Sequence, residues 1–289
     1  MKKQKNSDLE MVITVIIITH NNETTIQDCL NSVFKNPTPG FQKKIVVIDN
    51  DSQDGTPKIL NGLKHDRRIS KIILNNFNDG FGKTINTFIE QAQKRKARPS
   101  DFFFILNPDT TLESTALSRL LEAATNKKHL GLLSCTIVHP KTKKVLFKEG
   151  SIDFLRFRTT HTAPGAFQAS YVTGCALLIS KSLLQKIGAF DPNFFLYYED
   201  ADFSKRTLDA GMEIATESSA LCYHEESHSA TSETKDYFLT RNALYFFHKH
   251  YSFFALPYFW AVFSVRLIYH KYFSKKQVVL YAMQDFWKN

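Results

Sequence analysis

The chain has 289 residues, of which 43% are hydrophobic and 22% are charged, and this composition excludes a disordered protein. Its length allows one large domain, or a domain with an appendage, around a substantial core. The 37 Lys and Arg residues against 28 Asp and Glu give a net charge of +9. This excess favours an anionic partner, which could be nucleic acid, a phosphorylated small molecule or an anionic membrane surface.

The N-terminal region predicts a β-strand in place of a signal peptide. An apolar run at residues 11–18 follows several lysines, but Asp8 and Glu10 interrupt the region and no small-residue cleavage site follows. The cysteines form no CxxC pair and no metal-ligand spacing, so we expect reduced core residues of a cytosolic protein. These cysteines are Cys29, Cys135, Cys175 and Cys222.

Short β-branched runs alternate with amphipathic stretches through the first half of the chain, which predicts a parallel sheet with crossover helices. The predicted strands are residues 12–18, 44–48, 71–74 and 102–106, and the predicted helices are residues 24–34, 56–64 and 82–95. Later segments predict a strand at 170–179, a helix at 181–187 and a helix at 201–210 that ends at Gly211.

Polar residues follow each of the four predicted strands. Ligands of such folds bind beyond the carboxyl ends of the strands. The exits are His20-Asn21, Asp49-Asn50-Asp51, residues 75–80 and Asn107-Pro108-Asp109. Each alone is an ordinary turn, but four at one edge favour a nucleotide site.

Three carboxylates, Glu199, Asp200 and Asp202, stand directly behind the aromatic run FDPNFFLYY. Burying unpaired charge is costly and exposing many aromatic rings is unusual, so a catalytic pocket explains both features. In such a pocket burial would raise the pKa of a carboxyl group toward the range of a general base. The alternative is a solvated acidic turn after a buried strand.

The last part of the chain, residues 237–287, is rich in aromatic residues and punctuated by Arg and Lys. Its most apolar stretch, residues 253–265, contains Pro257 and is shorter than the roughly 20 residues that cross a bilayer. The pattern suits a helix lying on an anionic membrane. A helical subdomain packed against the core, or a homodimer interface, is the alternative. We therefore divide the chain into residues 1–230 and 231–289.

Six segments, taken in order, resemble the inverting glycosyltransferases of family 2, especially the bacterial rhamnosyltransferase-like branch. They are VIIITHNNETTIQDCL, VVIDNDSQDGT, NDGFGKTIN, FILNPDTT, the segment from Gly174 to Gly211, and His224. The resemblance spans roughly residues 12–230. It implies an α/β fold of the GT-A type, with a mostly parallel central sheet, followed here by a helical, aromatic-rich C-terminal extension.

The resemblance implies a donor site at the first strand exits. Asp49 would bind the base or ribose of the nucleotide, with Thr19 and Asn21 lining the same pocket. Asn78 and Gly80 would lie where a loop passes close to the nucleotide, which glycine permits. Asp51 departs from the pattern, because the family usually has Gly or a small residue there.

The resemblance also implies a metal site. Asn107-Pro108-Asp109 occupies the position of the DxD motif, so Asp109 is the expected ligand of Mn²⁺ or Mg²⁺. Asn107 replaces an acidic residue and would bind sugar or phosphate. His224 matches the histidine that completes the metal shell, and His228 is its rival.

The pair Glu199-Asp200 resembles the family's ED motif, and Asp200 is the expected general base for the acceptor hydroxyl. Glu199 would orient the acceptor or be the base itself. We expect Asp202 to form a structural salt bridge, with Arg206 as its partner. Arg206 has a second expected role, binding the departing diphosphate of the donor.

These expectations describe an enzyme at the cytoplasmic face of the cell membrane. It would transfer rhamnose from dTDP-rhamnose to a cell-surface polysaccharide or a lipid-linked glycan acceptor, with a UDP-sugar as the alternative donor. A sugar-phosphate nucleotidyltransferase is the rival enzyme class, although it gives no reason for the ED segment. We expect no nucleic-acid partner, because the aromatic residues are grouped with acids or in an apolar tail.

Overall fold

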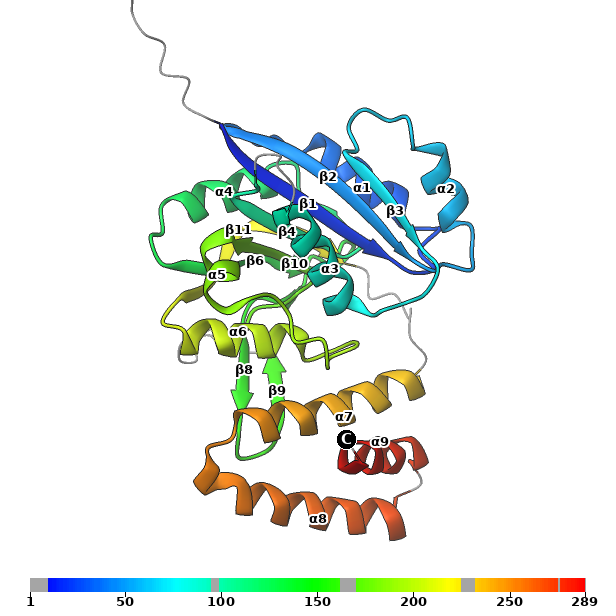
Figure 1. Cartoon of the computed structure of the whole chain (residues 1–289), viewed down its shortest axis with the longest axis vertical. Coiled ribbons are helices and arrows are strands. Elements are labelled where there is room, and N and C mark those ends of the chain that lie inside the picture. The colour runs from blue at the N-terminus through cyan, green and yellow to red at the C-terminus, as the bar shows by residue number, and fades with distance from the viewer. Residues whose placement is uncertain (1–9, 95–98, 162–169, 225–231, 275, 289) are drawn as a thin grey trace, which may run out of the picture.

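The computed structural model describes residues 10–94, 99–161, 170–224, 232–274 and 276–288. A central sheet carries helices on both faces, and three further helices lie together at one end of the molecule (Figure 1). The expected domain boundary at residue 230 and the rival ligand His228 lie outside the described residues.

The described elements alternate between strands and helices in the first half of the chain, as predicted. The strands are β1 Met11–Thr19, β2 Phe41–Asn50, β3 Lys71–Asn75, β4 Phe102–Leu106, β5 Thr110–Leu112, β6 Leu130–Val138, β7 Val145–Phe147, β8 Gly150–Asp153, β9 Arg158–His161, β10 Ala176–Ser180 and β11 Glu213–His224. The helices are α1 Ile26–Lys35, α2 Thr56–Gly62, α3 Phe81–Lys94, α4 Ala116–Thr125, α5 Lys181–Ile187, α6 Glu199–Asp209, α7 Ser232–His250, η1 Phe253–Ala255, α8 Leu256–Tyr272 and α9 Gln277–Lys288.

The large sheet has the strand order β3-β2-β1-β4-β10-β6-β11-β5, and β7 pairs with β6. Strands β3, β2, β1 and β4 are parallel. Strand β10 then runs antiparallel to both β4 and β6, and β11 is parallel to β6. Strands β8 and β9 form a separate antiparallel hairpin. The first half of the sheet is thus the predicted parallel unit, which places the exits of β1, β2 and β4 at one edge.

Strand β1 shows how the sequence builds two core layers. Ile13, Val15 and Ile17 belong to one buried cluster, and Ile16 and Ile18 belong to the cluster on the opposite face. This alternation follows from the two-residue period of a strand. Helices α1 and α4 cover the first face, and α3 and α5 cover the second.

Several predicted elements differ from the structure at their ends, and two of these differences bear on the site. The strand predicted at 170–179 is shorter, because only Ala176–Ser180 pairs with β4 and β6. The helix predicted at 201–210 begins earlier, at Glu199. All three acids of the ED segment therefore lie in the first helical turn, where the helix dipole favours negative charge.

The C-terminal helices share the core of the sheet. Leu244, Phe246 and Phe247 of α7 and Phe259 of α8 belong to the same buried cluster as β1 and α1. The apolar stretch predicted at 253–265 is shorter than the helical segment of the structure. That segment continues from Phe253 to Tyr272, which by length and composition alone is enough to cross a membrane, and only 11% of it is buried.

Candidate active site

The exits of β1 and β2 bring the predicted donor-site residues together. Thr19 lies opposite Asp49 in the register of these parallel strands. Asp49 is buried, and its carboxylate accepts hydrogen bonds from the backbone N–H and the hydroxyl of Ser52. Asn21 lies beside the same turn: its N–H donates to Ser52 Oγ at 2.8 Å, and its side-chain oxygen accepts from Gln53 N at 2.7 Å. These hydrogen bonds therefore hold the turns after β1 and β2 against each other.

Left-handed backbone occurs at two of these turn residues, Asn21 with φ 58° and Asp51 with φ 62°. Asn and Asp tolerate this conformation better than most residues do. The conformation explains why a glycine suits the position of Asp51, and why an aspartate can replace it.

Asn50 connects the second and third strand exits, a role that the sequence pattern did not predict for it. Its side-chain amide donates to Thr84 Oγ1 at 2.9 Å and to Gly80 O at 3.2 Å, and its side-chain oxygen accepts from Asn75 at 3.0 Å. It also lies 3.4 Å from Asn78 Oδ1. The sequence signal was present, because Asn50 stands inside the exit triplet of β2, but the residue acts on the loop and not on a ligand.

Gly80 is required where the loop after β3 meets the segment that precedes α6. Its φ is 78°, and a Cβ atom on it would lie 2.6 Å from Phe195 O and 2.7 Å from the Phe195 ring. The next residue, Phe81, donates its N–H to the same carbonyl at 3.1 Å. The loop after β3, residues 76–80 (the donor loop), is therefore in direct contact with the segment that leads to Glu199 and Asp200, residues 190–202 (the ED segment).

Asp109 and His224, the predicted metal ligands, are neighbours. Asp109 Oδ2 lies 3.2 Å from His224 Nε2, because β11 pairs with β5 and sets His224 opposite Thr110. A carboxylate oxygen and an imidazole nitrogen both suit Mn²⁺. No group of three or more His, Cys, Asp or Glu side chains that could hold a metal occurs within the described ranges. The two residues therefore fit a cation whose remaining ligands are donor phosphates and water, as is common for Mg²⁺.

A short path links this pair to the ED segment. Asn107 N donates to Cys175 O at 2.9 Å, and the residue before Cys175, Gly174, donates its N–H to Asp200 Oδ2 at 3.1 Å. The turn that holds Asp109 and the first turn of α6 that holds Asp200 are thus both bound to residues 174–175, the segment that leads into β10.

Asp200 and Glu199 differ in how their charge is supported. Asp200 Oδ2 accepts from Gly174 N, and its Oδ1 accepts from Ala201 N at 2.8 Å. Burial raises the pKa of Asp200, and these two N–H groups act in the opposite direction. Glu199 Oε2 is buried with no hydrogen-bond partner among the described residues. Burial, followed by repulsion from Asp200, raises the pKa of Glu199 to about 8, so Glu199 holds a proton at neutral pH.

The backbone before Glu199 is strained. Tyr197 and Tyr198 both have positive φ, 69° and 70°, which costs about 1–3 kcal/mol per residue outside glycine. Asn242 of α7 holds the strained segment: its buried side-chain amide donates to Leu196 O at 2.7 Å and to Tyr197 O at 3.0 Å. Nothing in the sequence near Asn242 signals this role, because it depends on how α7 docks.

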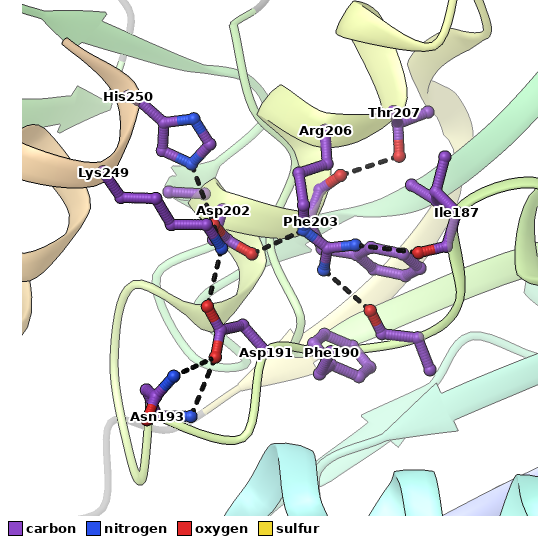
Figure 2. Close-up of polar contacts among 12 residues, drawn as sticks. Ile187, Phe190, Asp191, Asn193, Asp202, Phe203, Arg206, Thr207, Lys249 and His250 are labelled. Atoms are coloured by element: carbon purple, nitrogen blue, oxygen red, sulfur yellow. Dashed lines mark hydrogen bonds and ion pairs between the residues drawn. The ribbon is translucent and has the colours of Figure 1, made fainter.

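Asp202 anchors the catalytic helix through a cluster of charges (Figure 2). Its side chain is 0% exposed and binds Arg206 Nε at 2.7 Å, Lys249 Nζ at 2.6 Å and His250 Nε2 at 2.8 Å. Lys249 also binds Asp191 at 2.6 Å. The cluster therefore ties α6, the loop before it and the end of α7 together. The cations Arg206 and Lys249, with the hydrogen bond to His250, favour the ionised form of Asp202.

The expected Asp202–Arg206 salt bridge is part of this cluster. The two remaining guanidinium nitrogens of Arg206 bond to backbone carbonyls, Nη1 to Ile187 at 3.4 Å and Nη2 to Ala189 at 2.7 Å. Each nitrogen of Arg206 thus has a structural partner. The expected salt bridge of Arg206 is confirmed, and its second expected role, binding the donor diphosphate, stays a prediction.

Comparison with known proteins agrees with this geometry. The model of glycosyl transferase family 2 matches residues 14–188, more than half of the chain. An N-acetylglucosaminyl-diphospho-decaprenol L-rhamnosyltransferase of Mycobacterium tuberculosis is 24% identical over 209 residues, covering 64% of this chain and 67% of the relative. The glycosyltransferase YdaM of Bacillus subtilis, described as probable, is 22% identical and covers 74% of this chain and 50% of its own length.

Solved structures share the fold. The mannosyltransferase PcManGT from Pyrobaculum calidifontis, solved with GDP-Man and Mn²⁺, has a TM-score of 0.61 at 15% identity and covers 95% of this chain and 73% of its own. Residues 1–349 of S. aureus TarS have a TM-score of 0.55 at 22% identity, over 82% of this chain and 65% of that one. The chain thus spans about two thirds of that TarS fragment. With a GT-A fold and a family model over most of its sheet, the chain belongs to glycosyl transferase family 2.

Proposed function

We propose that the protein is an inverting, metal-dependent glycosyltransferase in which Asp200 deprotonates an acceptor hydroxyl. The observation that carries the proposal is the shared edge of the sheet, where Asp109, His224 and Asp200 converge beside the loop of Asn78 and Gly80. Inversion requires the acceptor to attack the anomeric carbon opposite the leaving nucleotide. Asp109, His224 and Asp200 are linked through residues 174–175, which supports an acceptor bound at Asp200 and a leaving diphosphate bound at Asp109 and His224.

Asp200 is better suited than Glu199 to act as the base. A base must be ionised near the working pH, and Glu199, with a pKa of about 8, is protonated there. Two backbone N–H groups stabilise the Asp200 carboxylate. Protonated Glu199 can instead donate a hydrogen bond to the acceptor or the donor sugar. This division of roles follows the general rule that neighbouring carboxyls with separated pKa values take different parts.

Asp109 and His224 would hold the divalent cation, Mn²⁺ or Mg²⁺. When bound, such a cation neutralises the negative charge that develops on the leaving diphosphate. Asp49, Thr19 and Asn21 would form the nucleoside end of the donor site. Asn107, which replaces an acid, leaves this site with less negative charge and would contact phosphate or sugar.

We infer rhamnose from dTDP-rhamnose as the donor, and a lipid-linked or cell-surface glycan as the acceptor. The mycobacterial relative is described as an L-rhamnosyltransferase of N-acetylglucosaminyl-diphospho-decaprenol, which supports both parts. A UDP-sugar is the alternative donor, since the TarS fragment was solved with UDP and with UDP-GlcNAc.

We also propose that α8 rests on the cytoplasmic face of an anionic membrane. Phe253 and Phe254, just before α8, are 80% and 91% exposed, and Tyr272 and Phe273 at its end are largely exposed. Lys271 near the C-terminal end of α8 adds positive charge to this apolar surface. Aromatic and basic residues together bind the interface of anionic bilayers. A homodimer through the same surface is the alternative.

A donor panel tests the enzymatic proposal. Hydrolysis of UDP-, dTDP- and GDP-sugars would be measured with and without Mn²⁺, and the anomeric configuration of the product would be read by NMR. Asp200→Asn should abolish turnover while donor affinity remains, and Asp209→Asn, at an exposed carboxylate of the same helix, is the matched control. Full turnover by Asp200→Asn, or a product with retained configuration, would refute the mechanism.

A further inference from the structure

The hairpin of β8 and β9 runs from the sheet to the C-terminal helices (Figure 1). Its strands pair from Gly150 with His161 to Asp153 with Arg158, and residues 154–157 form the tip. One end of the hairpin lies near the ED segment and the other end lies against α7 and α8. It belongs to neither the donor site nor the metal pair.

Three side chains, Tyr251 directly after α7 and two residues of α8, hold three successive carbonyls of the tip. Tyr251 donates its hydroxyl to Phe154 O at 2.5 Å, and Tyr258 donates to Leu155 O at 3.0 Å. Arg266 Nη2 donates to Arg156 O at 3.0 Å. An exposed loop tip has little reason to be fixed at three consecutive residues, so this clamp indicates that the position of the hairpin matters.

Aromatic packing reinforces the clamp. Phe157 is buried, has a left-handed φ of 51°, and its ring contacts those of Phe247, Tyr251, Tyr258 and Phe259 at 5.5 to 5.8 Å between centroids. The guanidinium of Arg266 lies 5.4 Å from the same ring. A strained, buried aromatic at a hairpin tip is stable only where the surroundings over-determine it.

The other end of the hairpin reaches the catalytic acids. Gly150 exchanges backbone hydrogen bonds with Tyr171, and Thr159 contacts the hydroxyl groups of Tyr171 and Tyr198. Tyr198 immediately precedes Glu199. Tyr171 also lies three residues before Gly174, whose N–H donates to Asp200 Oδ2 at 3.1 Å.

We propose that the β8–β9 hairpin is the acceptor-side wall of the active site, and that Tyr251, Tyr258 and Arg266 are positioning residues that hold this wall from the C-terminal helices. The donor loop meets the ED segment through Gly80 and Phe195. The hairpin meets the same segment at a different residue, Tyr198, and so borders Asp200 from another side. The proposal rests on the proposed function, because a wall matters only where a hydroxyl and water compete for the same base. It assigns α8 a part in catalysis besides membrane contact.

The test removes the three hydrogen bonds and keeps the rings. The variant Tyr251→Phe, Tyr258→Phe, Arg266→Gln is compared with Tyr281→Phe, Lys288→Gln, a control at exposed positions of α9. Water serves as the acceptor, so only a nucleotide-sugar donor is needed. A closed site protects reactive groups from water. A loosened wall should therefore admit water to the base and raise donor hydrolysis by about threefold or more, at unchanged donor KM.

Hydrogen–deuterium exchange of the amides of residues 158–161 is the second readout, and it should become faster in the clamp variant than in the control. Hydrolysis that matches the control, or that falls in step with the fraction of folded protein, would overturn the proposal. A wild-type protein that turns over no donor would instead refute the proposed function, and the inference with it. The two failures are thus distinguishable.

Discussion

Replacing Glu199 by Gln should stabilise the protein, and increasingly so as the pH rises. The pKa of this buried carboxyl is raised from 4.5 to about 8, so the folded state holds a proton that the unfolded state releases above pH 4.5. Each pKa unit corresponds to about 1.4 kcal/mol. The wild-type protein therefore loses stability between pH 4.5 and 8, by about 3 kcal/mol at pH 7 and by up to about 5 kcal/mol above pH 8. Gln carries no charge and escapes this loss.

Urea unfolding at pH 4.5, 7 and 8.5 measures the effect. The free energy of unfolding of Glu199→Gln, relative to wild type, should be close to zero at pH 4.5 and positive at the higher values. Glu90→Gln on the exposed face of α3 provides the baseline. Asp200→Asn should reduce the effect, because repulsion from Asp200 is the second cause of the raised pKa. A stability difference that does not change with pH would refute the reasoning.

Three further predictions concern the supports of the site. Asp202→Asn should lower the free energy of unfolding by about 3–5 kcal/mol, because Arg206 loses the fully buried carboxylate that it binds and Lys249 keeps only Asp191. The pKa of Asp202 lies at about 2, below its usual value, so wild-type stability should hold above pH 4 and fall as the pH drops toward 2. A Tm of Asp202→Asn equal to that of wild type would contradict this. Asn242→Ala should lower stability by about 2 kcal/mol through two lost hydrogen bonds and lower turnover further, whereas exposed Asn61→Ala should change neither. Asp109→Ala should abolish the Mn²⁺-dependent part of donor affinity in calorimetry, and equal donor affinity with and without Mn²⁺ in the wild type would contradict the metal pair.

The membrane proposal has its own test in vesicle partitioning. Phe253→Ser together with Phe254→Ser removes two exposed rings without touching the core. Burying one such ring contributes up to about 2 kcal/mol, so affinity for anionic vesicles should fall at least about tenfold. The same pair of changes should leave binding to neutral vesicles weak in both proteins. Unchanged partitioning, or a shift from dimer to monomer instead, would favour the homodimer interface.

The first half of the fold could be predicted from the sequence because its signals are local. Strand β1 is a largely apolar, β-branched run. The predicted ends of α5 match the observed ones, since a buried strand and a serine cap precede it. The exits of parallel strands must share an edge, and so the order of the strands was enough to place Thr19 and Asp49 together.

The rest depends on contacts between distant segments. Asn242 lies 45 residues from the carbonyl of Tyr197 that it binds, and no periodic pattern marks such a pair. The hairpin of β8 and β9 is short and polar, so its strands give a weak signal. The apolar stretch in the sequence ends before Arg266, whereas the helix continues through that residue to Tyr272. Pro257 occupies the first turn of α8, where it needs no hydrogen-bond partner.

The charge cluster around Asp202 constrains how this enzyme can diverge. Lys249 and His250 stand side by side at the end of α7, and both converge on one carboxylate of the catalytic helix. Exchanging the C-terminal helices with those of a relative would leave that carboxylate without two of its partners. Any natural recombination at this junction would have to carry both sides of the contact at once, so the tail and the acid pair are expected to be inherited as a single unit.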